Sequence, residues 1–581
     1  PDDLNMNQKL ENILNVSLDA TEDELRKADS LSTGYNWRDN TWEIIVKYSG
    51  SLESIRNRYN VYIKELLNYY AIIVADKATI ELISQEDVID YVEKPKSLYY
   101  QIERTKTAAC VGSVRADGNI LSGKGVIVGV IDTGIDIFDN AFRNSDGTTR
   151  ILNIYDQTTG EKYDKQSIDE YIRLNEDLSG GTFSYDNAPG VDNIMHGTDV
   201  SYIAAGSLGV AYEADIIAVK MGYSINNQFP RTTSLMDAID YIIRKAIEYR
   251  KPVAVNISYG CNYGAHNGNT LLESFIDDIS KSYRCVICVG SGNEADKAIH
   301  FGGIINTGQV QTAYLSVGEY QSAIDIQIWK NYWDTIDVML INPRGEQIGI
   351  ITEGRINRYE TYNTEIITLL GEPSPYNIYQ EIYINLIPKT DYILSGIWQI
   401  VLMAGSIRAG EYNIWLPSSQ ALGYATAFNN PTADGTITIP ATARNCIAVG
   451  AYNAYTNSYA AFSGRGFDNS IRNVNAGVKP DITAPGVDIS IARQRGNDIT
   501  YRNVTGTSYA VPVVTGAAAL LMQWGIVMGN DRFMYGEKLK AALIDGSKPV
   551  GLVGITRNDN QPDPRTGWGA VCLKNTLNKI L

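Results

Sequence analysis

Three residues whose types together can carry out nucleophilic catalysis occupy similar places in the sequence. Asp132 ends the apolar stretch GVIVGVID, His196 begins HGTDVSYIAAG, and Ser508 stands at the start of TSYAVPVVTGAAALLM. A serine hydroxyl alone is a poor nucleophile, but a neutral imidazole can take its proton. A buried aspartate can hold that imidazole in the correct tautomer. The three residue types therefore predict a nucleophile, a general base and an orienting carboxylate.

A parallel sheet with helices on both faces would bring these residues together. The short, β-branched runs GVIVGVID, DIIAVKMG, VAVNISYG and CVICVGSG predict strands buried on both faces. The segment SLMDAIDYIIRKAIEYRK between two of them has helical spacing of apolar residues. Reactive groups in such a doubly wound α/β fold lie beyond the carboxyl ends of the strands. We therefore expect all three residues at one edge of the sheet.

Ser508 follows a glycine, Gly506, at the mouth of a buried helix. Free backbone N–H groups and the helix dipole at this place would stabilise negative charge on a substrate carbonyl. Each residue also has an ordinary structural explanation, as a turn aspartate, a helix-capping histidine or an N-cap serine. The order Asp, His, Ser, each in a specific context, favours catalysis. His266 and His300 lack such contexts, and we expect structural roles for them.

The segments VIDTGID, HGTDVSYIAAG and GTSYAVPVVTGAAAL resemble the three signatures of the subtilisin-like serine proteases. The resemblance covers residues 123–303 and 436–580. It implies a serine endopeptidase that needs no cofactor. Calcium sites are common in the family, but no ligand cluster in this sequence can be assigned to one. The family usually has a second histidine where Asp199 stands and a small residue where Met195 stands, and neither position performs the chemistry.

Two further segments complete the resemblance. GSGNEA resembles the oxyanion segment and implies that the side chain of Asn293 donates to the developing oxyanion, together with the backbone N–H of Ser508. Without the neighbouring motifs, a turn asparagine would be the simpler explanation. NISYG resembles the strand that binds the substrate backbone. The implied substrate-binding residues are Ser258, Tyr259, Gly260 and Gly292, with Glu294 beside Gly292 on the second wall of the S1 pocket.

The N-terminal residues form a separate unit. Alternating strand and helix signals from Trp42 to about Lys96 predict a small α+β unit with an antiparallel sheet. The unit resembles the propeptide that serves these proteases as an intramolecular chaperone and inhibitor. The resemblance implies self-cleavage near the end of SLYYQ. We expect it between Gln101 and Ile102, with cleavage after Tyr100 as the second choice and a plain linker as the alternative.

An all-β segment interrupts the α/β pattern. Short alternating runs from about Thr312 to Tyr424 predict an inserted sandwich or jelly roll. The expected domains are a propeptide at 1–101, a first part of the protease domain at 102–310, an inserted β domain at 311–435, and a second part of the protease domain at 436–581. The predicted fold class is thus a subtilisin-like α/β sheet with two added units.

This combination of propeptide, triad and insertion is similar to the Csp germination proteases of clostridia. The resemblance implies a bacterial, spore-associated protease that activates a protein zymogen, a cortex-lytic enzyme, during germination. It also implies that the cleaved propeptide stays bound as a partner. Two alternatives remain open: a general secreted protease, and a catalytically silent regulatory protein on a protease fold.

Composition argues against several classes of partner and site. The formal net charge of −16 argues against nucleic acid as a partner. No apolar run is expected to cross a membrane, since the segment 510–522 is short and contains Pro512. No signal peptide is visible, but the sequence begins with Pro1, so secretion stays open. Cys285 and Cys288 form a CxxC inside an apolar run, which favours a buried strand over a metal site.

Overall fold

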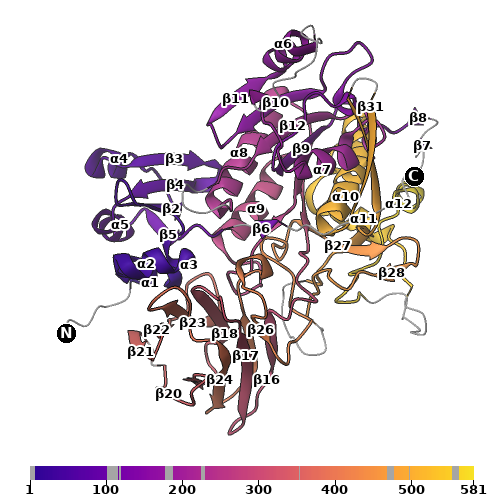
Figure 1. Ribbon diagram of the computed structural model, residues 1–581. Coiled ribbons are helices and arrows are strands. Elements are labelled where there is room, and N and C mark those ends of the chain that lie inside the picture. Colours follow the sequence, from indigo (N-terminus) through magenta and orange to yellow (C-terminus); the bar gives the residue numbers. More distant parts are fainter. Residues whose placement is uncertain are drawn as a thin grey trace.

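The structure is a computed structural model that describes most of the chain (Figure 1). The described residues are 7–97, 99–100, 115–116, 119–176, 187–223, 229–351, 354–467, 477–495, 498–551 and 562–581. Three units can be followed along the colours of Figure 1: an N-terminal α+β unit, a protease domain, and a β sandwich that the chain enters and leaves from the protease domain.

A nine-stranded sheet forms the centre of the protease domain. Its strands are β9 (Ile127–Asp132), β10 (Ile151–Asp156), β11 (Glu161–Asp164), β12 (Asp215–Lys220), β13 (Val253–Ile257), β15 (Cys285–Gly290), β27 (Ile447–Asn453), β28 (Ser458–Tyr459) and β29 (Ile482–Pro485). The order is β11-β10-β12-β9-β13-β15-β27, followed by β28 and β29, which both pair with β27. Only β11 and β28 run antiparallel to their neighbours. The expected parallel sheet is confirmed.

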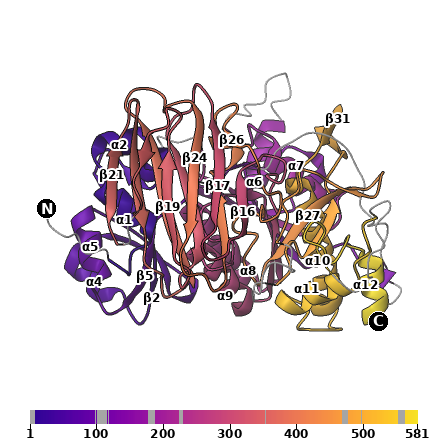
Figure 2. The same ribbon diagram turned by 90° about the horizontal axis from the view of Figure 1, so that it is seen from below.

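Helices cover both faces of this sheet, as Figures 1 and 2 show. Apolar side chains of α7 (His196–Ala205) and α10 (Thr507–Met522) form one core with the sheet, and those of α8 (Thr232–Tyr249) and α9 (Leu271–Ser282) form a second core on the other face. Cys285 and Cys288 on β15 are fully buried, one in each core, and burial raises the pKa of each thiol to about 12. The remaining helices are α6 (Lys165–Glu176), α11 (Gly536–Asp545) and α12 (Leu573–Ile580).

The helix that begins at Thr507 is longer than the sequence analysis expected. It continues beyond Met522 as one π-helical turn, and the whole segment 507–527 is long and apolar enough to cross a membrane. Within the structure, 89% of its apolar window is buried. The segment packs against α7 and against strands β13, β15 and β27, so it serves here as the core helix of the protease domain.

The N-terminal unit has a five-stranded antiparallel sheet. Its elements are β1 (Tyr35–Asn36), β2 (Thr41–Tyr48), β3 (Tyr62–Leu66), β4 (Tyr70–Ala75), β5 (Ile89–Glu93), α1 (Asn12–Asp19), α2 (Glu22–Lys27), α3 (Asp29–Ser32), α4 (Glu53–Tyr59) and α5 (Lys77–Ser84). One face of the sheet packs on α8 and α9, where the ring of Tyr70 lies 5.2 Å from that of Phe275. The other face shares a core with α1–α3 and with residues of the β sandwich, including Tyr383.

The inserted unit consists of two antiparallel sheets that share one apolar core. The six-stranded sheet contains β16 (His300–Ile304), β18 (Ile324–Asn331), β21 (Ile356–Glu360), β22 (Thr364–Leu370), β23 (Tyr379–Pro388) and β25 (Glu411–Trp415). The five-stranded sheet contains β17 (Val310–Val317), β19 (Ile336–Ile341), β20 (Gln347–Ile348), β24 (Gly396–Ala404) and β26 (Ala427–Phe428). The sandwich therefore begins before residue 311, because β16 already pairs with β25. The finer expectation of a jelly-roll topology stays a prediction.

Candidate active site

Asp132 and His196 lie in direct contact at one edge of the central sheet. Asp132 is the last residue of β9, and His196 is the first residue of α7. The Nδ1 atom of His196 lies 2.6 Å from Oδ1 of Asp132, and both side chains are 1% exposed. The Nε2 atom of His196 is buried and has no hydrogen-bond partner within the described part of the chain. The pair thus leaves one imidazole nitrogen available for proton transfer.

The start of α7 is fixed by contacts that the sequence analysis did not foresee. Asp192, which is fully buried, accepts hydrogen bonds from the backbone N–H groups of Met195 and Thr198 at 2.7 and 2.8 Å. It also accepts one from the hydroxyl of Thr133, the residue after Asp132. Asp192 therefore ties the strand end that carries Asp132 to the helix start that carries His196. An acidic residue shortly before a helix start is the signal that could have revealed it.

A glycine after His196 permits this close approach. A Cβ atom at Gly197 would lie 2.3 Å from the carbonyl oxygen of Gly134 and 2.9 Å from Cβ of Asp132. Any larger residue would push α7 away from β9, and the contact between Asp132 and His196 would be lost. The glycine of the HGT segment is thus a requirement of the site geometry.

Ser508 lies in the first turn of α10 and is fully buried. Gly506 precedes the helix with φ 148°, a backbone conformation that favours glycine. The backbone carbonyl of Ser508 accepts a hydrogen bond of 3.3 Å from the hydroxyl of Ser258. The next residue, Tyr509, places its ring 5.2 Å from the ring of His196. The helix start that carries Ser508 therefore adjoins both His196 and the predicted substrate strand.

The side chain of Asn293 contacts the start of α10. Its Oδ1 atom accepts hydrogen bonds from the backbone N–H and the hydroxyl of Thr507 at 3.0 and 3.2 Å. These two bonds fix the amide so that its Nδ2 group, buried and without a partner among the described residues, keeps both protons for another acceptor. Gly292 beside it has φ 94°, and a Cβ atom there would lie 2.5 Å from Thr438. Asn293 is thus held as a hydrogen-bond donor at the site.

Charge in the site favours protonation of His196. Burial lowers the pKa of its imidazole, but Asp132, with smaller contributions from Asp199 and Asp192, outweighs burial and raises the pKa above 6.5 overall. The aspartate thus has the effect expected of an orienting carboxylate, because it stabilises the imidazolium that forms when the base takes a proton.

The end of the N-terminal unit pairs with the predicted substrate strand. β6 (Tyr99–Tyr100) runs antiparallel to β14 (Tyr259–Gly260), with Tyr100 opposite Tyr259 and Tyr99 opposite Gly260. The backbone of residues 99–100 therefore lies on β14 as a peptide substrate would. The expected cleavage site, Gln101 and Ile102, lies outside the described residues.

The other two histidines lie away from Asp132. His266 and His300 both stack on the ring of Trp415, with ring centroids 4.1 and 4.9 Å from it. Their positions agree with the structural roles expected from the sequence. Among the residues that the structure describes, no group of three or more His, Cys, Asp or Glu side chains could hold a metal ion. Calcium binding therefore stays unassigned.

Comparison with known proteins identifies the family. A family model described as "Subtilase family" matches residues 123–373 and 409–569, which is more than half of the chain. The chain is a subtilase. It is therefore a serine protease of a family that needs no cofactor for catalysis, as the signature segments indicated. A second family model, "Csp protease B prodomain", matches residues 8–96 of this subtilase. The resemblance of the N-terminal unit to a protease prodomain is thus confirmed.

A solved structure agrees with both matches. The subtilase is 34% identical to the CspB protease of Clostridium perfringens, with a TM-score of 0.71, over 79% of this chain and 94% of that one. Curated relatives match over shorter stretches. Subtilase-type proteinase RRT12 of Saccharomyces cerevisiae is 33% identical over 128 residues, 22% of this chain and 23% of that protein. Subtilisin-like protease 10 of Arthroderma otae is 34% identical over 120 residues, 21% of this chain and 27% of that protein. The subtilase therefore spans about a quarter of the length of these curated relatives.

Proposed function

We propose that this subtilase hydrolyses peptide bonds with Ser508 as the nucleophile, His196 as the general base and Asp132 as the orienting carboxylate. The observation that carries the proposal is the 2.6 Å contact between Asp132 and His196, which leaves the buried Nε2 atom without a partner in the described chain. That nitrogen belongs to a helix that packs against the helix of Ser508. The proposed triad thus rests on this contact, on the packing of α7 against α10, and on the ring of Tyr509, the residue after Ser508, which lies 5.2 Å from that of His196.

The chemistry follows from these positions. Oγ of Ser508 attacks the carbonyl carbon of the scissile bond while Nε2 of His196 takes the hydroxyl proton. The carbonyl oxygen becomes an oxyanion, which accepts hydrogen bonds from Nδ2 of Asn293 and the backbone N–H of Ser508. The imidazolium then gives its proton to the leaving amide nitrogen, and an acyl-enzyme remains. A water molecule, activated by the same imidazole, hydrolyses that ester and restores Ser508.

The first substrate in this proposal is the chain itself, between Gln101 and Ile102. The pairing of β6 with β14 sets the register: residue 100 is opposite 259 and residue 99 is opposite 260. On the protease side the residue before Tyr259 is Ser258, whose hydroxyl bonds the carbonyl of Ser508. The register thus favours residue 101 over residue 100 as the residue whose carbonyl meets the nucleophile.

One experiment tests both the assignment of Ser508 as the nucleophile and the site of self-cleavage. Full-length protein and the Ser508→Ala variant are expressed side by side, and the fragments are measured by intact-mass spectrometry. We expect the wild-type chain to give residues 1–101 and 102–581, and the variant to stay whole. A wild-type chain that also stays whole would favour the silent regulatory alternative. Cleavage of the Ser508→Ala variant at the same bond would overturn the assignment of the nucleophile.

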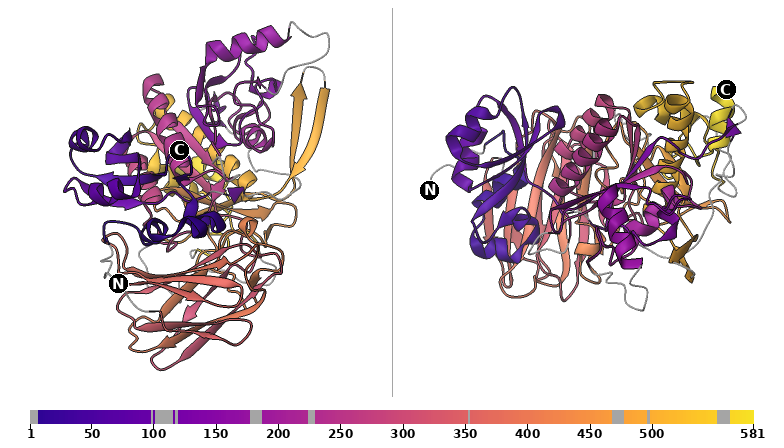
Figure 3. Two further views of the ribbon diagram at one scale, coloured as in Figure 1. Left: turned by 60° about the vertical axis from the view of Figure 1, so that its left-hand side comes forward. Right: turned by 90° about the horizontal axis from the view of Figure 1, so that it is seen from above.

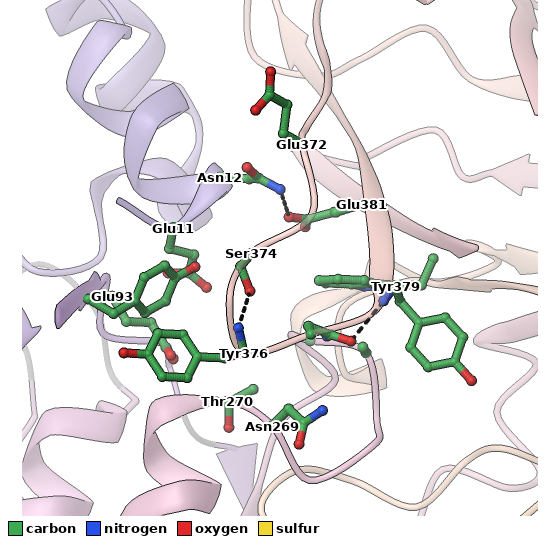
Figure 4. A pocket seen from close by; sticks show the side chains of 15 residues that line it. Glu11, Asn12, Glu93, Asn269, Thr270, Glu372, Ser374, Tyr376, Tyr379 and Glu381 are labelled. Carbon is green, nitrogen blue, oxygen red and sulfur yellow. Dashed lines mark hydrogen bonds between the residues drawn. The ribbon is translucent and has the colours of Figure 1, made fainter. Parts of the chain in front are cut away.

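We further propose that the cleaved prodomain stays bound. It contacts both the protease domain and the β sandwich around a cavity of about 50 Å³, which Figure 4 shows. Glu93 of the prodomain accepts a hydrogen bond of 2.7 Å from the backbone N–H of Leu271 at the start of α9. Asn12 of α1 donates to Glu381 of β23 at 3.0 Å, drawn as a dashed line in Figure 4. None of these contacts depends on the bond between residues 101 and 102.

Charge pairs strengthen the contact with the sandwich. Arg358 on β21 lies 2.8 Å from Asp19 and 3.0 Å from Glu24 of the prodomain, and Glu24 is almost fully buried. Cleaved protein applied to a size-exclusion column in physiological salt should elute as one peak that contains both fragments. Separate elution of the two fragments would contradict retention.

For the physiological substrate we propose a protein zymogen, a cortex-lytic enzyme of spores. The match of the prodomain to the CspB prodomain model, and of 79% of the chain to the CspB protease, supports this substrate class and a spore-associated location. The test uses spores of the organism that encodes the chain, with Ser508→Ala introduced at the native locus. We expect the cortex hydrolase to remain unprocessed and germination to fail. Normal processing in these spores would point instead to a general protease that acts on other proteins.

A further inference from the structure

A β hairpin that leads into the helix of Ser508 reaches back to the helix of His196. The hairpin consists of β30 (Ile489–Arg495) and β31 (Asp498–Val504), and it forms a two-stranded arm in Figure 3. Two of its arginines, Arg493 and Arg502, converge on the carboxylate of Asp199 in α7. Nε of Arg493 donates to Oδ1 of Asp199 at 3.0 Å, and a guanidinium nitrogen of Arg502 forms an ion pair with Oδ2 at 2.5 Å.

Asp199 lies one helical turn after His196 and is fully buried. Arg493 has a second contact on the other side of His196, where it donates to the carbonyl of Met195 at 2.8 Å. Met195 has φ 67°, a conformation that is rare for residues other than glycine and needs support from its surroundings. Arg493 therefore holds α7 both before and after the catalytic histidine.

The same hairpin contacts the other two parts of the site. Arg495 donates to Asp136, in the loop that follows Asp132, at 2.7 Å. At its other end the hairpin runs into α10, where Tyr509 follows Ser508 and packs on the ring of His196. Arg495 is 48% exposed and Arg502 is 40% exposed, so solvent screens both of their ion pairs, whereas Arg493 is only 11% exposed and Asp199 is fully buried.

We propose that Arg493 and Arg502, through Asp199, position the imidazole of His196 relative to Ser508. The proposal rests on the proposed function and adds positioning residues to it. A buried carboxylate needs paired cations, and two guanidinium groups supply them in a fixed, planar geometry. The carboxylate of Asp199 is what joins α7 to the two arginines of the hairpin, because a neutral or cationic side chain at this position could not form these ion pairs.

The charged groups around His196 allow a test, because different variants should shift the pKa of its imidazole in opposite directions. Asp132, Asp192 and Asp199 all raise the pKa of its imidazole. Arg493 and Arg502 lower the pKa of Asp199, and Arg493 brings positive charge to the carbonyl of Met195 beside His196. Tyr509, whose own pKa is raised by burial, is the neighbouring group from α10. Removal of the Asp199 charge should therefore lower the pKa of His196, and removal of an arginine charge should raise it.

The experiment measures the rate of self-cleavage of the full chain against pH, after dilution from denaturant. For Asp199→Asn we expect the acidic limb of the profile to move to lower pH by about half a unit or more. For Arg493→Gln the limb should move to higher pH. Arg493→Lys keeps the charge but cannot contact Asp199 and the carbonyl of Met195 at the same time. The midpoint of its pH profile should therefore stay, while the maximal rate of self-cleavage falls about tenfold to a hundredfold.

Arg150 provides the matched control. It is buried and donates to the carbonyl of Ala205, at the opposite end of α7 from His196. Arg150→Lys should change the urea midpoint without moving the pH midpoint. Folding of every variant is checked by urea unfolding in the Ser508→Ala background, and if Asp199→Asn does not fold, Arg493→Lys carries the test.

The outcomes distinguish a failure of the proposed function from a failure of the positioning proposal. If the wild-type chain does not cleave itself, or if Ser508→Ala still does, the proposed function is wrong. If wild type cleaves and both Asp199→Asn and Arg493→Lys match it in rate and in pH midpoint, positioning by Arg493 and Arg502 is overturned. A loss of rate in Arg493→Lys that merely follows its loss of stability, as in Arg150→Lys, would also overturn it.

Discussion

The imidazole of His196 contacts Asp132 through Nδ1 at 2.6 Å, in a site where both side chains are 1% exposed. Because the carboxylate accepts the Nδ1 proton, the neutral ring carries its lone pair on Nε2. The hydrogen bond thus sets the tautomer as well as the orientation of the base.

Asp132→Asn tests that role. An asparagine keeps the size but can donate to Nδ1, which favours the tautomer that has no lone pair on Nε2. We expect the rate of self-cleavage to fall about 10⁴-fold, the loss known for the equivalent change in a chymotrypsin-type triad. The rate is measured by quantitative gel analysis over time. A fall of less than tenfold would mean that Asp132 does not set the tautomer.

The pH dependence of the reaction follows from the same pair. Burial lowers the pKa of His196, but Asp132, Asp199 and Asp192 together raise it by more, so the pKa lies above 6.5. The base must be neutral, so self-cleavage should fall as the pH drops through a midpoint above 6.5. A profile that stays flat down to pH 5 would contradict a role for His196 as base.

The raised pKa also predicts the pH dependence of stability. A group that binds its proton more tightly in the folded state stabilises that state at low pH, and the effect is lost as pH rises through the folded pKa. The contribution of His196 should therefore be complete below pH 6.5 and absent well above its folded pKa. Urea unfolding of Ser508→Ala, compared with Ser508→Ala/His196→Gln at several pH values, measures it. If the two variants differ in free energy of unfolding by the same amount at every pH, the raised pKa of His196 is contradicted.

The oxyanion donor can be tested separately from its structural contacts. Oδ1 of Asn293 holds Thr507, and Nδ2 remains for the substrate. Asn293→Asp keeps an acceptor for Thr507 but removes the donor. Loss of such a donor costs a factor of about 10² to 10³ in kcat, a value measured on a subtilisin. We expect a similar loss in the self-cleavage rate. A Thr507→Val control, which removes only the hydroxyl contact, should leave most of the rate.

The elements that carry Asp132, His196 and Ser508 could be predicted from the sequence because each residue stands in a short segment whose local pattern is informative. GVIVGVID shows a buried strand that ends at Asp132, and TSYAVPVVTGAAALLM shows a buried helix that begins beside Ser508. The parallel sheet then requires these ends to meet at one edge. Sequence pattern alone thus placed the residues on the correct elements.

Contacts between segments that are far apart in the chain leave no pattern in the local sequence. Asp199 pairs with Arg493 and Arg502, which are about 300 residues away, and nothing in either local sequence points to the other. The same holds for β16, which looked like part of the protease domain because its partner β25 comes much later in the chain. The interface between the prodomain and the sandwich could not be foreseen for the same reason.

A buried charge cluster lies inside the prodomain, next to the place where Glu93 accepts a hydrogen bond from the backbone N–H of Leu271 in the protease domain. Nζ of Lys96 is almost fully buried and contacts Oε1 of Glu11 at 2.6 Å as well as a carboxylate oxygen of Glu93. Burial raises the pKa of Glu11 to about 7, although Lys96 lowers it. Lys96→Met would leave two buried carboxylates without their cation.

Removal of one partner from a buried ion pair typically costs about 3–5 kcal/mol. We expect a loss of this size in the free energy of unfolding at pH 8, measured in the Ser508→Ala background. The loss should be smaller at pH 5, because Glu11 can then be protonated. A second change, Glu11→Gln, should restore part of the stability. Arg26→Met, which breaks an exposed ion pair with Glu22, serves as the control and should have no measurable effect. A Lys96→Met variant as stable as this control would show that the cluster does not stabilise the folded protein.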